Sequence, residues 1–295
     1  TNILMSYLFM TTIKITNPVT NENLPKRLRY STLLNYPNCP KRFILSRKLQ
    51  PRFKKKNEND MLKGSLFEYW ATGGTSSPIV ANMAEKWVTD KAYKIGKFQN
   101  ETIEKVYKAA QSAKKAFVKT LFANHEFIIK LGKSEWELEF HPDVIGVVKL
   151  PDFPEPFAAI TDTKYTASIQ EVWGHKESKL DFLQAMVYIY GFYHYSKQNM
   201  EKAMLLPFVY QITEHNDFSN PIHKYVIIRA DESDFIEFEH LLKTIMNDKE
   251  FKPKVNHFNC VGKGNQFGPC RYLDECPEGR VLINKTEVFN YGSLK

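Results

Sequence analysis

A change of hydrophobic period near residue 125 constrains the fold of this chain more than any other feature of its sequence. Before that point, apolar residues recur at helical spacing, as Ile103, Val106 and Tyr107 do. After it, the segments EFIIKL, SEWELEFHPDVIGVVKL and FAAITDTKYTA place apolar residues at every second position, which is typical of strands. The sequence therefore predicts helices first and a sheet afterwards.

The same patterns give the expected elements. Helices are expected over 61–72, 79–94, 100–122, 180–195 and 232–247, and later strands over 203–213 and 223–229. Strands and helices that follow one another in this way predict an α/β core with a largely mixed sheet.

The charge of the chain favours a polyanionic partner. Its formal net charge is +8 and its pI is near 9.1, which suits nucleic acid, although a lysine-rich surface would give the same value. The first ten residues lack a basic leader and a small-residue cleavage site, and no stretch reaches the roughly 18 apolar residues of a membrane span. We expect a cytoplasmic protein without membrane contact.

One carboxylate and one lysine stand out within the strand pattern. In ITDTKYT, Asp162 and Lys164 lie two residues apart, so both side chains leave the same face of a strand. Such a pair can hold a divalent cation beside a group that orients water, as phosphodiester hydrolysis requires. The alternative for this pair by itself is a surface ion pair of small energetic value.

A second carboxylate strengthens the first interpretation. Asp143, in HPDVIGVV, comes 19 residues before Asp162, a distance that allows a strand, a turn and an antiparallel return strand. Antiparallel neighbours would bring both carboxylates within reach of one ion, and such hard oxygen ligands suit Mg²⁺ or Mn²⁺. By parity, Glu139 and His141 share the strand face of Asp143 and could support it, or His141 could be an ordinary packed or surface histidine.

Three motifs in this order resemble those of the PD-(D/E)XK nucleases, and specifically their RecB-like branch. They are Pro142–Asp143, the run DTK that ends at Lys164, and the run QAMVY from Gln184 to Tyr188, which is similar to the QxxxY motif of that branch. The resemblance implies a restriction-endonuclease-like core, with a central mixed sheet flanked by helices, an N-terminal helical insertion and a C-terminal cysteine-rich clasp.

The resemblance also implies roles for individual residues. The acidic residues Asp143 and Asp162 would bind Mg²⁺ or Mn²⁺ together with the carbonyl of Thr163, and Lys164 would position the attacking water. Glu68, in KGSLFEYW, would be a further metal ligand on an upstream helix, where many relatives carry histidine.

The QxxxY motif would lie next to the substrate. In such nucleases this motif belongs to the helix that follows the catalytic strands, so Gln184 and Tyr188 are expected to bind DNA. Their spacing of four residues places both side chains on one helical face. An ordinary amphipathic helix would give the same spacing.

The four cysteines lie at opposite ends of the chain. In a long chain of this kind they favour metal binding, catalysis or burial over a disulfide framework. One precedes the expected nuclease core and three follow it, at Cys39, Cys260, Cys270 and Cys276. This arrangement resembles the iron-sulfur clasp of AddB-type and CRISPR-adaptation nucleases. Four thiolates would hold a [4Fe-4S] cluster or, alternatively, a structural Zn²⁺.

These expectations divide the chain into four regions. They are an N-terminal segment with the first cluster cysteine (1–60), a helical region with Glu68 (61–124), the nuclease core (125–250) and a cysteine-rich tail that packs on the N-terminal segment (251–295).

The implied function is a metal-dependent DNA nuclease. By the resemblance, it would be an exonuclease on single-stranded or end-containing DNA in recombination, repair or phage DNA metabolism, with recombination or helicase proteins as possible partners. The alternatives are a catalytically inactive DNA-binding subunit and an endonuclease.

Overall fold

The structure is a computed structural model that describes residues 26–48, 58–74, 77–166, 182–214 and 221–254, together with Cys270 and Cys276. Within these residues, no helix has both the length and the apolar character that crossing a bilayer requires.

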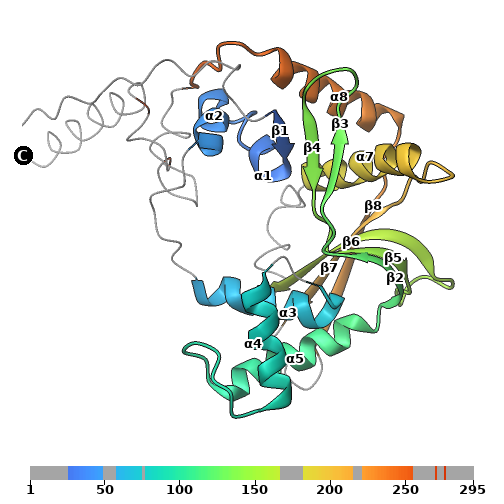
Figure 1. Ribbon diagram of the computed structural model, residues 1–295. Coiled ribbons are helices and arrows are strands. Elements are labelled where there is room, and N and C mark those ends of the chain that lie inside the picture. The colour runs from blue at the N-terminus through green and yellow to red at the C-terminus, as the bar shows by residue number, and fades with distance from the viewer. Residues whose placement is uncertain are drawn as a thin grey trace, which may run out of the picture.

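A five-stranded sheet forms the centre of the molecule (Figure 1). Its strands are β2 (Phe117–Ala123), β5 (Val144–Val148), β6 (Phe157–Thr166), β7 (Phe208–Glu214) and β8 (Ile222–Ile228), in that spatial order. β6 and β7 run parallel, whereas the other neighbours run antiparallel. The sheet is therefore mixed, and the expected α/β class is confirmed.

A smaller sheet of three strands lies beside α7 (Figure 1). Its centre is β4 (Glu137–Phe140), which pairs with β3 (Phe127–Lys130) in antiparallel and with β1 (Arg27–Arg29) in parallel orientation. The chain passes directly from β4 into β5, so the loop at 141–143 connects the two sheets.

Three of the helices that precede the central sheet in the sequence form a lobe of their own below it in Figure 1. They are α3 (Glu58–Thr72), α4 (Pro78–Thr89) and α5 (Asn100–Lys114), and their buried side chains form a separate hydrophobic cluster around Trp70 and Trp87. Through its contacts with β6, α3 holds this lobe against the central sheet.

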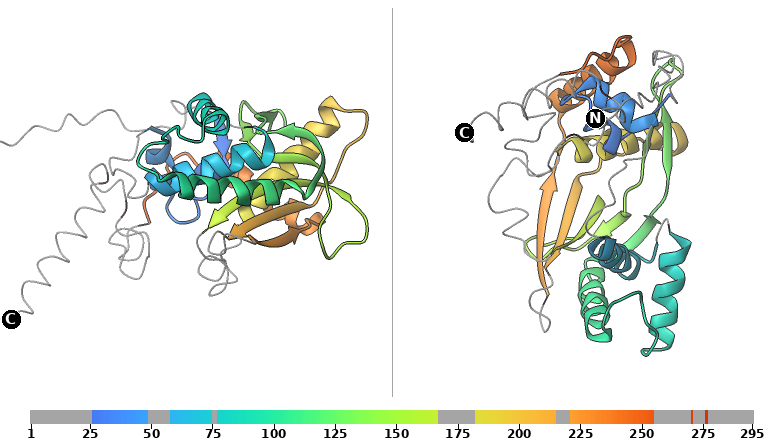
Figure 2. Two further views of the ribbon diagram at one scale, coloured as in Figure 1. Left: turned by 90° about the horizontal axis from the view of Figure 1, so that it is seen from below. Right: turned by 90° about the vertical axis from the view of Figure 1, so that its left-hand side faces the viewer.

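The main hydrophobic core lies on the face of the central sheet opposite this lobe. It is covered by α7 (Phe182–Asn199) and α8 (Glu232–Asn247). Asp231 caps α8 by accepting hydrogen bonds from the backbone N–H groups of Ser233 and Asp234. The short helices α1 (Tyr30–Leu33) and α2 (Pro40–Lys48) contact each other, and α1 also contacts α7. In the right-hand view of Figure 2 they lie at the same end of the molecule as α7 and α8, opposite the lobe of α3, α4 and α5.

Two expected helices are wrong at their ends. The helix predicted over 79–94 stops at Thr89. The helix predicted over 100–122 stops at Lys114, and β2 begins at Phe117. The segment FVKTLFA is rich in β-branched and aromatic residues, which favour strands. Pairing with β5 prevails over a longer helix because it gives this segment the backbone hydrogen bonds of a sheet edge.

Candidate active site

The two aspartates meet across neighbouring strands, as their spacing predicts. β5 pairs antiparallel with β6, and Val144 lies opposite Thr161, so Asp143 falls opposite Asp162. Asp143 Oδ2 accepts hydrogen bonds from the backbone N–H of Thr163 at 2.6 Å and from its hydroxyl at 2.8 Å. Both carboxylates are buried. The strand register therefore fixes the distance between them.

The environment of Asp143 opposes its negative charge. Burial raises the pKa of Asp143 well above the usual aspartate value, and the charges of Asp162 and Glu68 raise it further. The charge of Lys164 and the N–H of Thr163 lower this pKa but do not offset the rise. Asp143 thus holds a proton more tightly than an exposed aspartate does.

Lys164 lies beside Asp162 on the same face of β6. Its Nζ is 2.5 Å from Asp162 Oδ2, and its side chain remains 43% exposed. Burial by itself lowers the pKa of Lys164, but the carboxylates of Asp162 and Asp143 outweigh that effect and the pKa is raised. Lys164 is therefore an ammonium group at neutral pH, and part of its side chain is open to solvent.

Glu68 faces this pair from α3. The ring of Phe67 stacks on Tyr165 of β6 with 4.9 Å between centroids, which anchors this turn of the helix on the strand. Burial raises the pKa of Glu68, a hydrogen bond from Asn124 lowers it, and the charge of Asp162 raises it again. Glu68 is thus close enough to the two aspartates to interact with their charges.

The QxxxY pair of α7 lies behind the aspartates. Gln184 Nε2 donates to Asp162 Oδ1 at 2.9 Å and is 3.4 Å from the Tyr188 hydroxyl. The Tyr188 hydroxyl donates to the carbonyl of His141 at 3.0 Å. Both side chains are buried. The structure therefore brings together Glu68, Asp143, Asp162, Thr163, Lys164, Gln184 and Tyr188.

Two neighbours of the site were not singled out from the sequence. Asn124 has a φ of 46°, donates from its backbone N–H to the Asp143 carbonyl at 2.9 Å and donates from its side chain to the Gly74 carbonyl. Tyr210 donates to Gln184 Oε1 at 3.1 Å. Asn124 follows a segment that was expected to be helical, and Tyr210 belongs to no recognised motif. Only the pairing of the strands shows that both residues lie next to the site.

The centre holds more negative than positive charge. Lys164 is the cation that acts on all three carboxylates, those of Glu68, Asp143 and Asp162, which leaves an excess of two negative charges when all are ionised. Asp162 Oδ2 is sealed from solvent, and besides its ion pair with Lys164 it accepts no hydrogen bond from the residues that the structure describes. A divalent cation would balance this excess, and carboxylate oxygens are the ligands that Mg²⁺ and Mn²⁺ prefer.

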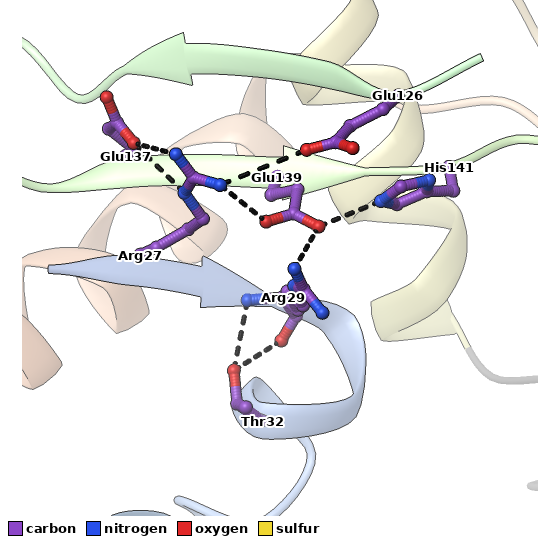
Figure 3. Close-up of polar contacts among 7 residues, drawn as sticks. All are labelled: Arg27, Arg29, Thr32, Glu126, Glu137, Glu139 and His141. Atoms are coloured by element: carbon purple, nitrogen blue, oxygen red, sulfur yellow. Dashed lines mark hydrogen bonds and ion pairs between the residues drawn. The ribbon is translucent and has the colours of Figure 1, made fainter. Parts of the chain in front are cut away.

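A second acidic group lies on the smaller sheet (Figure 3). One ligand atom of Glu126, one of Glu139 and one of His141 lie within 4.8 Å of one another. Among the described residues no other three such side chains are this close together. Glu68, Asp143 and Asp162 therefore lie further apart than this group. In contrast to the centre on β6, the carboxylates of this group are already paired with the guanidinium groups of Arg27 and Arg29.

Glu139 is the centre of an ion-pair network. It contacts Arg29 Nη2 at 2.5 Å, His141 Nε2 at 2.8 Å and Arg27 Nη1 at 3.3 Å (Figure 3). Although burial raises the pKa of Glu139, the hydrogen bonds from His141 and Arg29 lower it overall. A cation here would compete with two arginines. Glu139 and His141, expected to support Asp143, instead pair with each other, and Glu139 also pairs with the two arginines.

Three of the four cysteines lie in the described residues, and none of the three forms a disulfide. Cys39 precedes α2, and its Sγ accepts a hydrogen bond from the backbone N–H of Lys254 at 3.4 Å. Cys276 packs on Leu45 of α2, and Cys270 packs against both. Segments from both ends of the chain thus meet at α2. Cys260 lies outside the described residues.

Comparison with known proteins gives no family. No family model and no curated protein matches the sequence. Among solved structures, a protein from Eubacterium rectale described as a candidate exonuclease has 15% identity and a TM-score of 0.48, covering 82% of this chain and 88% of its own. The protein SSO0001 has 11% identity and a TM-score of 0.35, with coverage of 85% and 86%. Likenesses this weak do not bear on function.

Proposed function

We propose that this chain is a metal-dependent nuclease that hydrolyses DNA phosphodiester bonds, with Asp143, Asp162 and Lys164 at its centre. The observation that carries the proposal is the excess of negative charge among three carboxylates that share one lysine. Such an arrangement is costly unless a cation compensates it, and perturbed carboxylates of this kind cluster at functional sites.

The ligands of the proposed ion are Glu68, Asp143, Asp162 and the carbonyl of Thr163. When bound, Mg²⁺ or Mn²⁺ would lower the pKa of water and neutralise charge that develops on the phosphate. Asp143 is held by Thr163 and Asp162 by Gln184, so two of these carboxylates are fixed before an ion arrives. Such preorganisation is what a metal site requires of the residues around its ligands.

Lys164 acts as a cation in this proposal. Because the surrounding carboxylates raise its pKa, Lys164 is a hydrogen-bond donor and a poor base at neutral pH. It therefore positions the attacking water and stabilises negative charge on the phosphate oxygens. Gln184 donates a hydrogen bond to Asp162, and Tyr188 donates one to the His141 carbonyl. Both residues therefore act on the substrate indirectly, through these partners.

The proposed substrate is single-stranded or end-containing DNA, cut exonucleolytically. A net charge of +8 supports binding to phosphates without regard to base sequence. Roles in recombination, repair or phage DNA metabolism, with helicase or recombination proteins as partners, belong to the same proposal.

The cysteines are proposed to hold a structural [4Fe-4S] cluster, with Zn²⁺ as the alternative. The support is the meeting of Cys270 and Cys276 with α2, at whose start Cys39 accepts an N–H hydrogen bond. Cys260 would be the fourth ligand. Hydrolysis needs no redox step, so the cluster would only join the two ends of the chain.

Digestion of labelled single-stranded DNA with Mn²⁺ tests the nuclease. Lys164→Ala is expected to lower kcat by about 10²–10³-fold, which is typical for loss of one group that stabilises developing charge. Exposed Lys133 provides the control, and Lys133→Ala should retain wild-type turnover. Wild-type turnover by Lys164→Ala would contradict the mechanism.

Two further outcomes separate the alternatives. A wild-type protein that binds DNA but does not cut it with Mn²⁺ or Mg²⁺ would favour the inactive binding subunit. Cleavage of circular single-stranded DNA would exclude a pure exonuclease, because a circle has no end.

A further inference from the structure

A buried tyrosine of β7 stands directly beside Asp162. In the parallel pairing of β6 and β7, Asp162 is the register partner of Tyr210, so both side chains leave the same face of the sheet. Tyr210 is 1% exposed, and its hydroxyl donates to Gln184 Oε1 at 3.1 Å. Its ring lies against Phe208 with 4.7 Å between centroids. The hydroxyl is thus the polar end of a packed side chain.

This hydroxyl completes the pairing of the Gln184 carboxamide. An ionised carboxylate only accepts hydrogen bonds, so the NH₂ group of Gln184 must face Asp162, as its distance of 2.9 Å shows. The amide oxygen then faces Tyr210, which supplies the donor that this buried oxygen needs. Without that donor, the buried oxygen would lack this partner, and the amide would lose one of the three contacts that orient it.

The same carboxamide connects both aspartate strands. Its NH₂ group lies 3.4 Å from the Tyr188 hydroxyl, which donates to the carbonyl of His141. His141 is two residues before Asp143 in the loop between β4 and β5. One amide therefore contacts Asp162 directly and reaches the segment of Asp143 through Tyr188.

We propose that Tyr210 is a positioning residue of the metal centre: its hydroxyl orients Gln184, which in turn orients the Asp162 carboxylate toward the ion. The role in metal binding rests on the proposed function, whereas the effect on Gln184 and Asp162 does not. In this role Tyr210 acts on the ion through the Gln184 amide, without itself touching substrate or ion.

The Mn²⁺ dissociation constant, measured without DNA by electron paramagnetic resonance of free Mn²⁺, tests the metal part. Tyr210→Phe removes only the hydroxyl and is expected to weaken Mn²⁺ binding by about 10-fold or more, as for other groups that orient metal ligands. Tyr190→Phe is the matched control, because Tyr190 is a largely buried tyrosine whose hydroxyl contacts Glu239, 3.5 Å away. This control should bind Mn²⁺ as the wild type does.

A double-mutant cycle shows whether Tyr210 acts through Gln184. Gln184→Met removes the amide, and in that background Tyr210→Phe should weaken Mn²⁺ binding no further. Full additivity of the two effects would overturn the inference, since independent residues add.

A readout on the metal-free protein keeps this inference distinct from the proposed function. Tyr210→Phe, but not Tyr190→Phe, should shift the NMR signals of the Gln184 side-chain amide and the Asp162 carboxyl carbon. If the wild type binds no Mn²⁺ but these signals shift, the metal function fails and the positioning role stands. If the wild type binds Mn²⁺ and cuts DNA while Tyr210→Phe matches it in affinity and in these signals, the positioning role is overturned alone.

Discussion

At the scale of single residues, the site is defined by charges that destabilise the metal-free protein. Asp143 is buried next to two other carboxylates, and one lysine cannot compensate all three. The sequence indicated Asp143, Asp162 and Lys164 because strand parity and motif spacing depend on the chain alone. It did not indicate Asn124 or Tyr210, since their importance arises from pairing with distant segments.

The charge of Asp143 gives a prediction for stability and pH. Because burial raises the pKa of Asp143 in the folded state, the folded protein binds this proton more tightly than the unfolded one. Stability is therefore lost as pH rises from about 4 through the raised pKa. Asp143→Asn should raise the Tm of the metal-free protein at pH 7, by about 2–4 °C for each kcal/mol of repulsion removed.

Thermal melts of wild type and Asp143→Asn between pH 4 and pH 8 check this. The difference in Tm should grow with pH and become small at the acidic end, where both side chains are neutral. Addition of Mn²⁺ should stabilise the wild type more than the variant. A variant with lower Tm throughout this range would refute the account of Asp143.

At the scale of elements, α7 is held close to the smaller sheet by a glycine. A Cβ on Gly191 would lie 2.5 Å from the ring of Phe140 in β4, whereas a Cβ on Gly64 of α3 would meet nothing within 4 Å. Helix α7 carries Gln184 and Tyr188, so this close approach also sets the distance of both side chains from the aspartates.

Gly191→Ala is therefore expected to lower the free energy of unfolding, by about 1–3 kcal/mol for an overpacked core. The matched control is Gly64→Ala, which should stabilise the protein by roughly 0.5–1 kcal/mol because alanine favours a helix interior. Urea denaturation of both variants measures the two values. Equal effects of the same sign would contradict the described packing of α7 on β4.

The elements also show where sequence patterns fail. The strands around Asp143 and Asp162 and the helix over 232–247 follow from hydrophobic period and capping. The segment 117–122 was expected to be helical, and it forms β2 because β5 offers it a pairing partner. Local preference cannot anticipate a partner that lies more than 20 residues away.

At the scale of the whole molecule, α2 is where segments far apart in the sequence meet. Cys39 lies at its start, and Cys270 and Cys276 pack at Leu45. A site that joins residues this far apart in sequence restricts the unfolded chain and should add to stability. The resemblance of the cysteine arrangement to an iron-sulfur clasp implied such a site, but that arrangement does not distinguish iron-sulfur from zinc.

Anaerobic purification followed by an absorption spectrum and metal analysis tests the clasp. We expect a broad absorption band at about 400 nm. Cys39→Ser should abolish this band and lower the Tm of the protein. Ser46→Ala, a change on the adjacent helix α2, is the control and should keep the band. Stoichiometric zinc without this band would replace the cluster by the alternative site.

The most direct test of the central claim is the position of Mn²⁺ in crystals of the protein, located by anomalous scattering. The account predicts an ion between Asp143 and Asp162, with Glu68 as a further ligand, which is lost in Asp162→Asn and kept in the exposed control Asp152→Asn. An ion bound instead by Glu126, Glu139 and His141, or no ion at the aspartates at saturating Mn²⁺, would contradict it.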